Sequence, residues 1–101
     1  MTGLPTQDAF AAQLNTCFKV LDGPPEEFAL DLTRVSELRV TPVQQMFSIL
    51  FRGPSEWFLP QRMYRLRHEH LGEFDLFLVP VAQEGEFFVY EAVFNQLIPP
   101  A

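Results

Sequence analysis

Short β-forming segments separated by turn signals constrain the fold of this chain more than any other feature. In residues 28–33, Phe28, Leu30 and Leu32 alternate with polar or small residues, and this period of two predicts a strand with one buried face. Similar β-rich segments cover residues 16–21, 46–51, 63–70, 74–81 and 87–94. Because short turns join these segments, we expect a mainly β fold of about six strands, either a small antiparallel β-barrel or a sandwich.

The two ends of the chain differ from this strand pattern. Residues 6–14 predict one short helix that Thr6 caps, with Phe10 and Leu14 on the face that docks onto the sheet. Residues 96–101 predict an extended tail, because paired prolines cannot continue a helix or an inner strand. The whole chain, residues 1–101, is expected to form a single domain with the β meander at residues 16–95.

Three connections in the meander are specific enough to test. Residues 36–43 lack a firm period and read as a connection, and Arg52-Gly53-Pro54 is a turn signal that should end the third strand. We also expect residues 63–69 and 73–79 to form an antiparallel hairpin in which Gly72 has positive φ.

A three-residue loop at 70–72 would set the register of this hairpin. Leu66 would then lie opposite Leu76 and Arg67 opposite Asp75, although Glu69 would also face Glu73, which is unfavourable. The outward-facing Arg65 and Arg67 alternate with apolar residues, and we expect one of them to pair with Asp75.

The composition is sufficient for a hydrophobic core without disulfides or structural metal ions. The chain is 48% hydrophobic and has eleven Phe residues, which is enough for a domain of 101 residues to bury a core. The residues that we expect to be buried are Phe28, Leu30, Leu32, Phe47, Ile49, Phe51, Leu66, Leu76, Leu78 and Phe94. Cys17, the only cysteine, excludes an intramolecular disulfide and is expected to be a buried structural residue.

The charge balance excludes several partners. The formal net charge is -6 and Lys19 is the only lysine among seven basic residues, which argues against binding to nucleic acid or anionic membrane. No apolar stretch approaches the roughly 20 residues that span a bilayer, and no signal peptide is visible. We therefore expect a cytoplasmic protein.

One cluster has the residue types of a metal site. On a strand, His68 and His70 would point the same way, and Glu73 follows three residues later. The spacing resembles the metal box of cupins but is too short between the second His and the Glu, and no further His is present. A half-exposed hairpin end is the competing interpretation, and it is the one that we prefer.

Large apolar residues in unusual places are the stronger functional candidates. Trp57, Phe58 and Leu59 lie in a loop between Pro54 and Pro60, where they either plug one end of a barrel or anchor an interface.

Two strand segments add to this signal because they are apolar on both faces. Phe77 and Val79 alternate with Leu76 and Leu78, and Met46 and Leu50 alternate with equally apolar neighbours. One face fills the core, so the other predicts self-association or a permanent protein partner, with Phe77, Val79, Trp57 and Phe58 as the interface candidates.

The order of these segments resembles a family of small uncharacterised bacterial proteins known only as a domain of unknown function. The resemblance rests on Phe47-Ser48-Ile49-Leu50-Phe51-Arg52-Gly53-Pro54, Leu59-Pro60-Gln61, Tyr64-Arg65-Leu66 with His68, Leu71-Gly72, Phe77-Leu78-Val79-Pro80-Val81 and Tyr90-Glu91-Ala92-Val93-Phe94-Asn95. One departure is Arg62-Met63, where the family pattern favours Gly-Thr. The family carries no assigned activity, so no catalytic residue transfers; the resemblance implies an accessory role near phage-tail-collar-like proteins.

Two functions from different classes remain open on the sequence. We favour a non-enzymatic structural or protein-interaction module without a cofactor, in the setting of a phage-tail-like assembly, because no catalytic set is visible. The alternative is a metal- or small-ligand-binding β-barrel, which could be an enzyme, that uses His68, His70 and Glu73.

Overall fold

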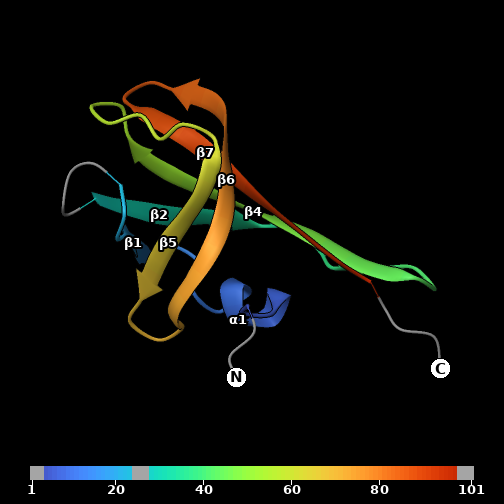
Figure 1. The fold of residues 1–101 in the computed structure, drawn as a ribbon. Coiled ribbons are helices and arrows are strands. Elements are labelled where there is room, and N and C mark those ends of the chain that lie inside the picture. Colours follow the sequence, from blue (N-terminus) through green and yellow to red (C-terminus); the bar gives the residue numbers. More distant parts are fainter. Residues whose placement is uncertain (1–3, 24–27, 98–101) are drawn as a thin grey trace.

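The computed structural model describes residues 4–23 and 28–97, and these residues form one short helix and seven strands (Figure 1). The elements are α1 (Gln7–Ala11), β1 (Cys17–Val20), β2 (Phe28–Val35), β3 (Arg39–Val40), β4 (Gln44–Pro54), β5 (Arg62–His68), β6 (Gly72–Glu84) and β7 (Phe87–Leu97). No helix in these two ranges is long and apolar enough to cross a membrane.

Six of the strands close into an antiparallel β-barrel. The hydrogen-bonded order is β2-β1-β5-β6-β7-β4, and an additional pairing between β2 and β4 joins the two ends of this series. This pairing joins the two ends of the sheet, although β6 and β7 pair with each other over only part of their length. The predicted fold class is therefore confirmed, and the barrel replaces the sandwich as its specific form.

Alternating side chains of the six strands fill the barrel. Eight of the ten predicted core residues are buried, and the other two, Phe47 and Phe94, are half-buried and pack against the core. The buried hydrophobic residues that the sequence analysis did not include are Phe18, Val20, Leu59, Tyr64, Phe74, Val89, Tyr90 and Ala92, besides Phe10 of the helix.

Cys17 is a correction to the predicted core. Phe18 and Val20 are the inward residues of β1, so Cys17 points outward, and its thiol donates a hydrogen bond to Asp31 Oδ1 at 3.3 Å. The prediction was wrong because it did not assign the two faces of this short strand, on which every second side chain is exposed.

The helix closes one end of the barrel with a single side chain. Thr6 caps it, as predicted, by accepting a hydrogen bond from the backbone N–H of Ala9, and Asn15 ends the following turn with a φ of 65°. Phe10 is fully buried, whereas Leu14 is 38% exposed, so only one residue of the predicted pair docks. The ring of Phe10 contacts aromatic rings from four strands, those of Phe18, Phe47, Phe74 and Phe94.

Strands β4 and β7 continue past the barrel as an extension that is visible in Figure 1. We call this part, made of β3, residues 44–48 of β4 and residues 92–97 of β7, the arm. The expected connection at 36–43 thus contains β3, which pairs with β4, and the predicted tail begins later because β7 runs to Leu97. The rest of that tail, residues 98–101, lies outside the described residues.

Gly53 is another correction, because it does not make the predicted turn. It lies within β4 opposite Phe88, and the turn follows at residues 55–57. A Cβ atom on Gly53 would lie only 2.7 Å from Leu30 Cδ2. The glycine therefore permits close packing of β4 against the core. A Gly-Pro pair occurs both in turns and at such close contacts, so the sequence alone did not distinguish the two roles.

The β5–β6 hairpin forms, and Gly72 has a φ of 80° as expected, but its register differs from the prediction. Leu66 lies opposite Phe74 and Arg67 opposite Glu73, so the loop is residues 69–71. This register replaces the unfavourable Glu69–Glu73 pair by one of opposite charge. The same faces remain buried because the shift is an even number of residues.

Candidate interaction groove

The barrel interior is filled at both ends in the described structure. Phe10 occupies the end next to α1, and Leu59, fully buried, occupies the other. The backbone N–H of Leu59 donates to the Tyr90 hydroxyl at 3.0 Å, which fixes the loop over the barrel. A ligand site must therefore be sought outside the barrel.

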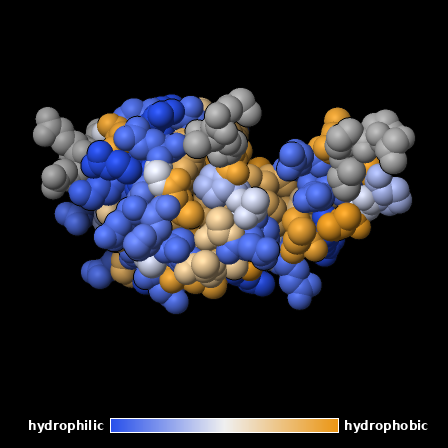
Figure 2. Space-filling model, turned by 90° about the horizontal axis from the view of Figure 1, so that it is seen from below, coloured by the Kyte–Doolittle hydropathy of each residue, from blue (hydrophilic) through white to orange (hydrophobic). Residues whose placement is uncertain are grey.

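A groove with a cavity volume of about 650 Å³ lies between α1, the β5–β6 hairpin and the arm. This volume falls within the range of about 300–1,000 Å³ that is usual for ligand pockets. In Figure 2, apolar atoms run from the barrel onto the arm, and the outline of the molecule is hollowed between them.

The groove is lined mainly by apolar side chains that remain exposed. Met63 is 52% exposed, Phe77 46% and Val93 66%, while Leu4 contributes from the segment before α1 and Leu38 from the position before β3. Phe47 and Phe94, whose stacked rings are 4.4 Å apart, line the side next to the core. Exposed apolar surface that is concentrated in one place is typical of a binding site.

The charges at the groove are acidic. Asp8, in the first turn of α1, and Asp75, on β6, are its only charged lining residues among those described. Arg65 pairs with Asp75 at 3.3 Å and with Glu73 at 3.5 Å from the outer face of β5. A cationic partner is therefore favoured electrostatically over an anionic one.

The structure divides the predicted interface residues between two places. Phe77 lines the groove, whereas Val79 is half-buried in the part of β6 that pairs with β7. Trp57 and Phe58 are 43% and 51% exposed, but their loop lies at the opposite end of the barrel from α1 (Figure 1).

Of the two interpretations that the sequence left open, the plug applies to Leu59, and the interface role of the loop stays a prediction. Leu59 is the plug, and the two aromatic residues before it stay on the surface, where Phe58 packs edge-on against Phe88 with ring centroids 5.2 Å apart.

The predicted metal-site residues do not converge. His68 is buried, His70 is exposed in the turn, and Glu73 lies on the outer face of β6 beside Arg65. Among the described residues, no group of three or more His, Cys, Asp or Glu side chains could hold a metal ion.

His68 instead uses both ring nitrogens to hold the structure together. Its Nδ1 accepts hydrogen bonds from the backbone N–H groups of His70 at 3.0 Å and Leu71 at 3.3 Å. Its Nε2 must then carry the proton, which it donates to Thr16 Oγ1 at 2.8 Å, and the Thr16 hydroxyl donates to the Gln13 carbonyl at 2.6 Å. Burial, and then the neighbouring His70, lower the pKa of His68, so the neutral form is favoured.

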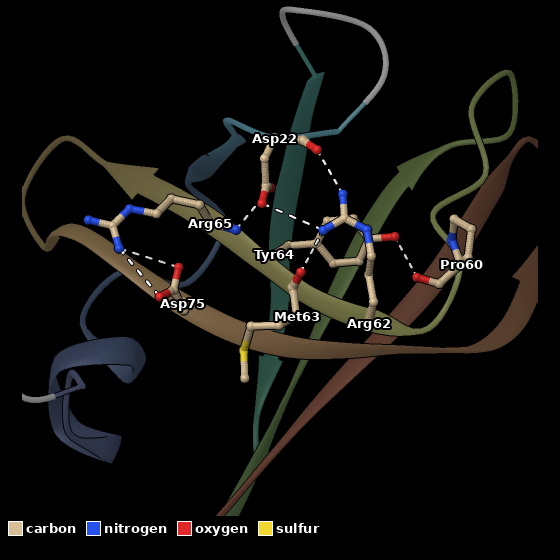
Figure 3. Close-up of polar contacts among 7 residues, drawn as sticks. All are labelled: Asp22, Pro60, Arg62, Met63, Tyr64, Arg65 and Asp75. Atoms are coloured by element: carbon tan, nitrogen blue, oxygen red, sulfur yellow. Dashed lines mark hydrogen bonds and ion pairs between the residues drawn. The ribbon is translucent and has the colours of Figure 1, made fainter.

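A polar network at the start of β5 is a feature that the sequence analysis missed (Figure 3). Arg62 donates to the Asp22 carbonyl at 2.7 Å, and the Asp22 carboxylate accepts from the backbone N–H of Arg65 at 3.0 Å. The Arg62 guanidinium lies 4.0 Å from the centroid of the Tyr64 ring, and the Tyr64 hydroxyl donates to the Pro60 carbonyl. These contacts join the end of β1 to β5 and to the plug loop, so their role is structural.

The sequence analysis also missed most of the groove, because Phe77 was the only one of its lining residues that was predicted as an interface candidate. Met63 could have been recognised as an exposed apolar residue, because the alternation of the expected strand at residues 63–70 places it on the outer face with Arg65. Val93, Asn95 and Gln96 could not be recognised as groove residues from the sequence, because they line it only where β7 continues beyond its pairing with β6.

Together, the filled interior and the apolar groove define a class of molecule, a small closed β-barrel domain with a groove on its outer surface. Residues 5–94 match the family model described as "Domain of unknown function (DUF6916)", and the chain belongs to this family. No curated protein and no solved structure matches the chain.

Proposed function

We propose that this chain is a non-enzymatic protein-interaction module that binds its partner through the groove and the adjoining arm. The observation that carries the proposal is the concentration of half-exposed apolar side chains around one acidic groove, with Phe77 and Val93 on opposite walls. Interfaces of stable complexes bury apolar side chains of this kind in their central part.

The polar residues with chemical potential have structural partners instead of a shared site. His68 is bonded at both nitrogens, and the Tyr64 and Tyr90 hydroxyls hold the plug loop. Partial burial, and then the hydrogen bond to Asp31, raise the pKa of the Cys17 thiol, which makes it a weak nucleophile at neutral pH. These roles favour an interaction module over an enzyme.

The metal-binding alternative has less support. A metal ion at His68 would have to replace either the bond to Thr16 or the pair of bonds that shape the hairpin turn. An accessory role in a phage-tail-like assembly is a setting in which an interaction module of this kind would act, and we include it in the proposal.

The size of the protein in extract from cells that naturally produce it tests this function. We expect the unmodified protein to elute in a complex well above 11.6 kDa on size-exclusion chromatography. Phe77→Glu should move it to the monomer position, because a charge in the groove opposes burial of the surrounding apolar surface.

A matched control distinguishes the groove from exposed apolar residues in general. Val81 lies on the same strand, is 48% exposed and does not line the groove, so Val81→Glu should leave the complex intact. Elution of the unmodified protein as a monomer, or equal loss of the complex in both variants, would contradict the proposal. Circular dichroism melting of both purified variants checks that they are folded.

A further inference from the structure

Strands β6 and β7 separate within the barrel wall, and the groove lies where they part. Residues 79–84 of β6 pair with residues 87–91 of β7, and beyond this point the two strands no longer pair with each other. Residues 72–78 of β6 then pair only with β5, and residues 92–97 of β7 only with β4. Among the described residues, no other backbone group bonds to these two segments.

Each segment therefore has one edge whose backbone groups lack a partner in the described structure. In an antiparallel strand, alternate residues direct their N–H and C=O groups to opposite sides, so every second residue faces the open edge. The open edge of β7 carries the sequence Ala-Val-Phe-Asn-Gln-Leu, which has no charged residue and no proline. Natural proteins commonly protect free strand edges with charged residues or proline. The absence of both residue types from this edge indicates that it is used for pairing.

The lining of the groove confirms that it runs along these edges. Consecutive residues line it on both sides: Ala92, Val93, Phe94, Asn95 and Gln96 from β7, and Asp75, Leu76 and Phe77 from β6. Because consecutive side chains of a strand point to opposite faces, a groove on one face would show only every second residue. Contact with every residue in turn is what the edge of a strand provides.

The negative charge of the groove favours a different partner over a second copy of this chain. Its charged lining residues, Asp8 and Asp75, are both acidic, and the whole chain has a formal net charge of -6. Two copies would bring these like charges together, whereas an added segment that carries Lys or Arg would complement them.

We propose that the opening between β6 and β7 accepts an extended segment of another protein as an added strand. The segment has apolar residues at alternate positions, which contact the groove beside Phe77 and Met63, and at least one Lys or Arg near Asp8 or Asp75. It runs antiparallel to one of the two strands and parallel to the other, because β6 and β7 are antiparallel to each other. At about 3.3 Å per residue, the six residues of the open β7 edge accommodate about 20 Å of extended chain.

Selection of peptides on the intact protein tests this inference. Random nine-residue peptides displayed on phage should be enriched for alternating apolar residues with Lys or Arg, and the recovered peptides should bind as synthetic peptides. Amide hydrogen exchange measured by NMR should show new protection within residues 92–97, where the unbound edge exchanges rapidly.

Modified peptides give the decisive comparison. Backbone N-methylation at alternate positions should weaken binding about tenfold or more in the set that faces β7, because two or three hydrogen bonds are lost. Replacing the basic residue by Glu should also weaken binding, and added salt should reduce that difference. Phe77→Glu should abolish binding, while Val81→Glu should retain it.

Four outcomes would overturn the inference: no enrichment, helical bound peptides, new protection that lies outside both open edges (residues 72–78 and 92–97), or tolerance of N-methylation at every position. A dimer of the purified protein that protects this same edge would instead assign it to a second copy. The inference rests on the proposed interaction function. The extract experiment tests that function by itself, so failure of the function and failure of the added strand can be distinguished. A complex in extract that depends on Phe77, without peptide binding at the edge, overturns only the added strand.

Discussion

The Nε2 atom of His68, at the end of β5, lies 2.8 Å from the hydroxyl oxygen of Thr16, which immediately precedes β1. Through Thr16 the imidazole connects the β5–β6 turn to the Gln13 carbonyl in the turn that follows α1. One buried side chain thus joins two connections that are far apart in sequence. The bonds at both ring nitrogens need the neutral imidazole.

The pH dependence of stability should report on this residue. Burial lowers the pKa of His68 in the folded state, so the unfolded chain binds a proton more readily below about pH 6.5. The free energy of unfolding should therefore be unaffected by this group at pH 8 and should fall as the pH drops below about 6.5, by up to about 1.4 kcal/mol per pH unit. Urea unfolding at pH 8, 7, 6 and 5 measures this slope.

Two variants assign the slope to His68. His68→Gln should be less stable at pH 8 but should lose most of the pH dependence. His70→Gln should keep most of it, because burial affects the pKa of His68 more than the neighbouring His70 does. Identical slopes in the unmodified protein and His68→Gln would show that other groups control the acid sensitivity.

Truncation of the helix plug should be costly. Phe10 is fully buried among four aromatic rings, so Phe10→Ala should lower the free energy of unfolding by roughly 3–5 kcal/mol. Leu14→Ala, in the turn that follows the same helix, should cost much less because Leu14 is 38% exposed. Guanidinium unfolding followed by circular dichroism compares the two; similar losses would mean that the helix stabilises the barrel by some route other than Phe10.

Gly53 should not tolerate a methyl group. The added Cβ of Gly53→Ala would approach Leu30 Cδ2 to 2.7 Å, and overpacking of this kind costs about 1–3 kcal/mol. Leu30→Val shortens the opposing side chain, so the double variant should be more stable than the sum of the two single effects predicts. Thermal unfolding of the four proteins gives the coupling, and purely additive effects would exclude the steric explanation.

The hydroxyl of Tyr90 should hold the plug loop. Tyr90→Phe leaves the buried N–H of Leu59 without its acceptor, which costs about 1–3 kcal/mol in comparable cases. The Leu59 amide should then exchange faster with solvent, and the fluorescence of Trp57 in the same loop should change. Unchanged exchange at Leu59 would indicate that packing alone fixes the loop.

The period of two and the turn signals were sufficient to predict the class of fold, because both are local properties of the sequence. The hairpin register was not predictable in the same way, since the turn is fixed by the His68 side chain accepting from His70 and Leu71. The role of Gly53 was also not predictable, because the sequence Arg52-Gly53-Pro54 is compatible both with a turn and with close packing against Leu30.

The candidate site was less accessible to prediction than the fold. Phe77 was identified because it is apolar on a strand whose other face is also apolar. The partners that make a groove of it, such as Val93, are brought there by the separation of β6 from β7. Which stretch of a strand remains unpaired depends on the length and register of its neighbours, and these are properties of the assembled barrel.

The contact between Phe10 and Phe94 has a consequence for how the domain is made. Their ring centroids are 5.3 Å apart, although the two residues lie near opposite ends of the chain. When the ribosome releases the N-terminal segment, the aromatic rings that will enclose Phe10 have not all been synthesised. The helix therefore cannot dock fully until β7 emerges, and stable folding must await the synthesis of residues up to β7. Stalled or truncated products that lack β7 should leave Phe10 exposed and be preferred substrates for chaperones and proteases.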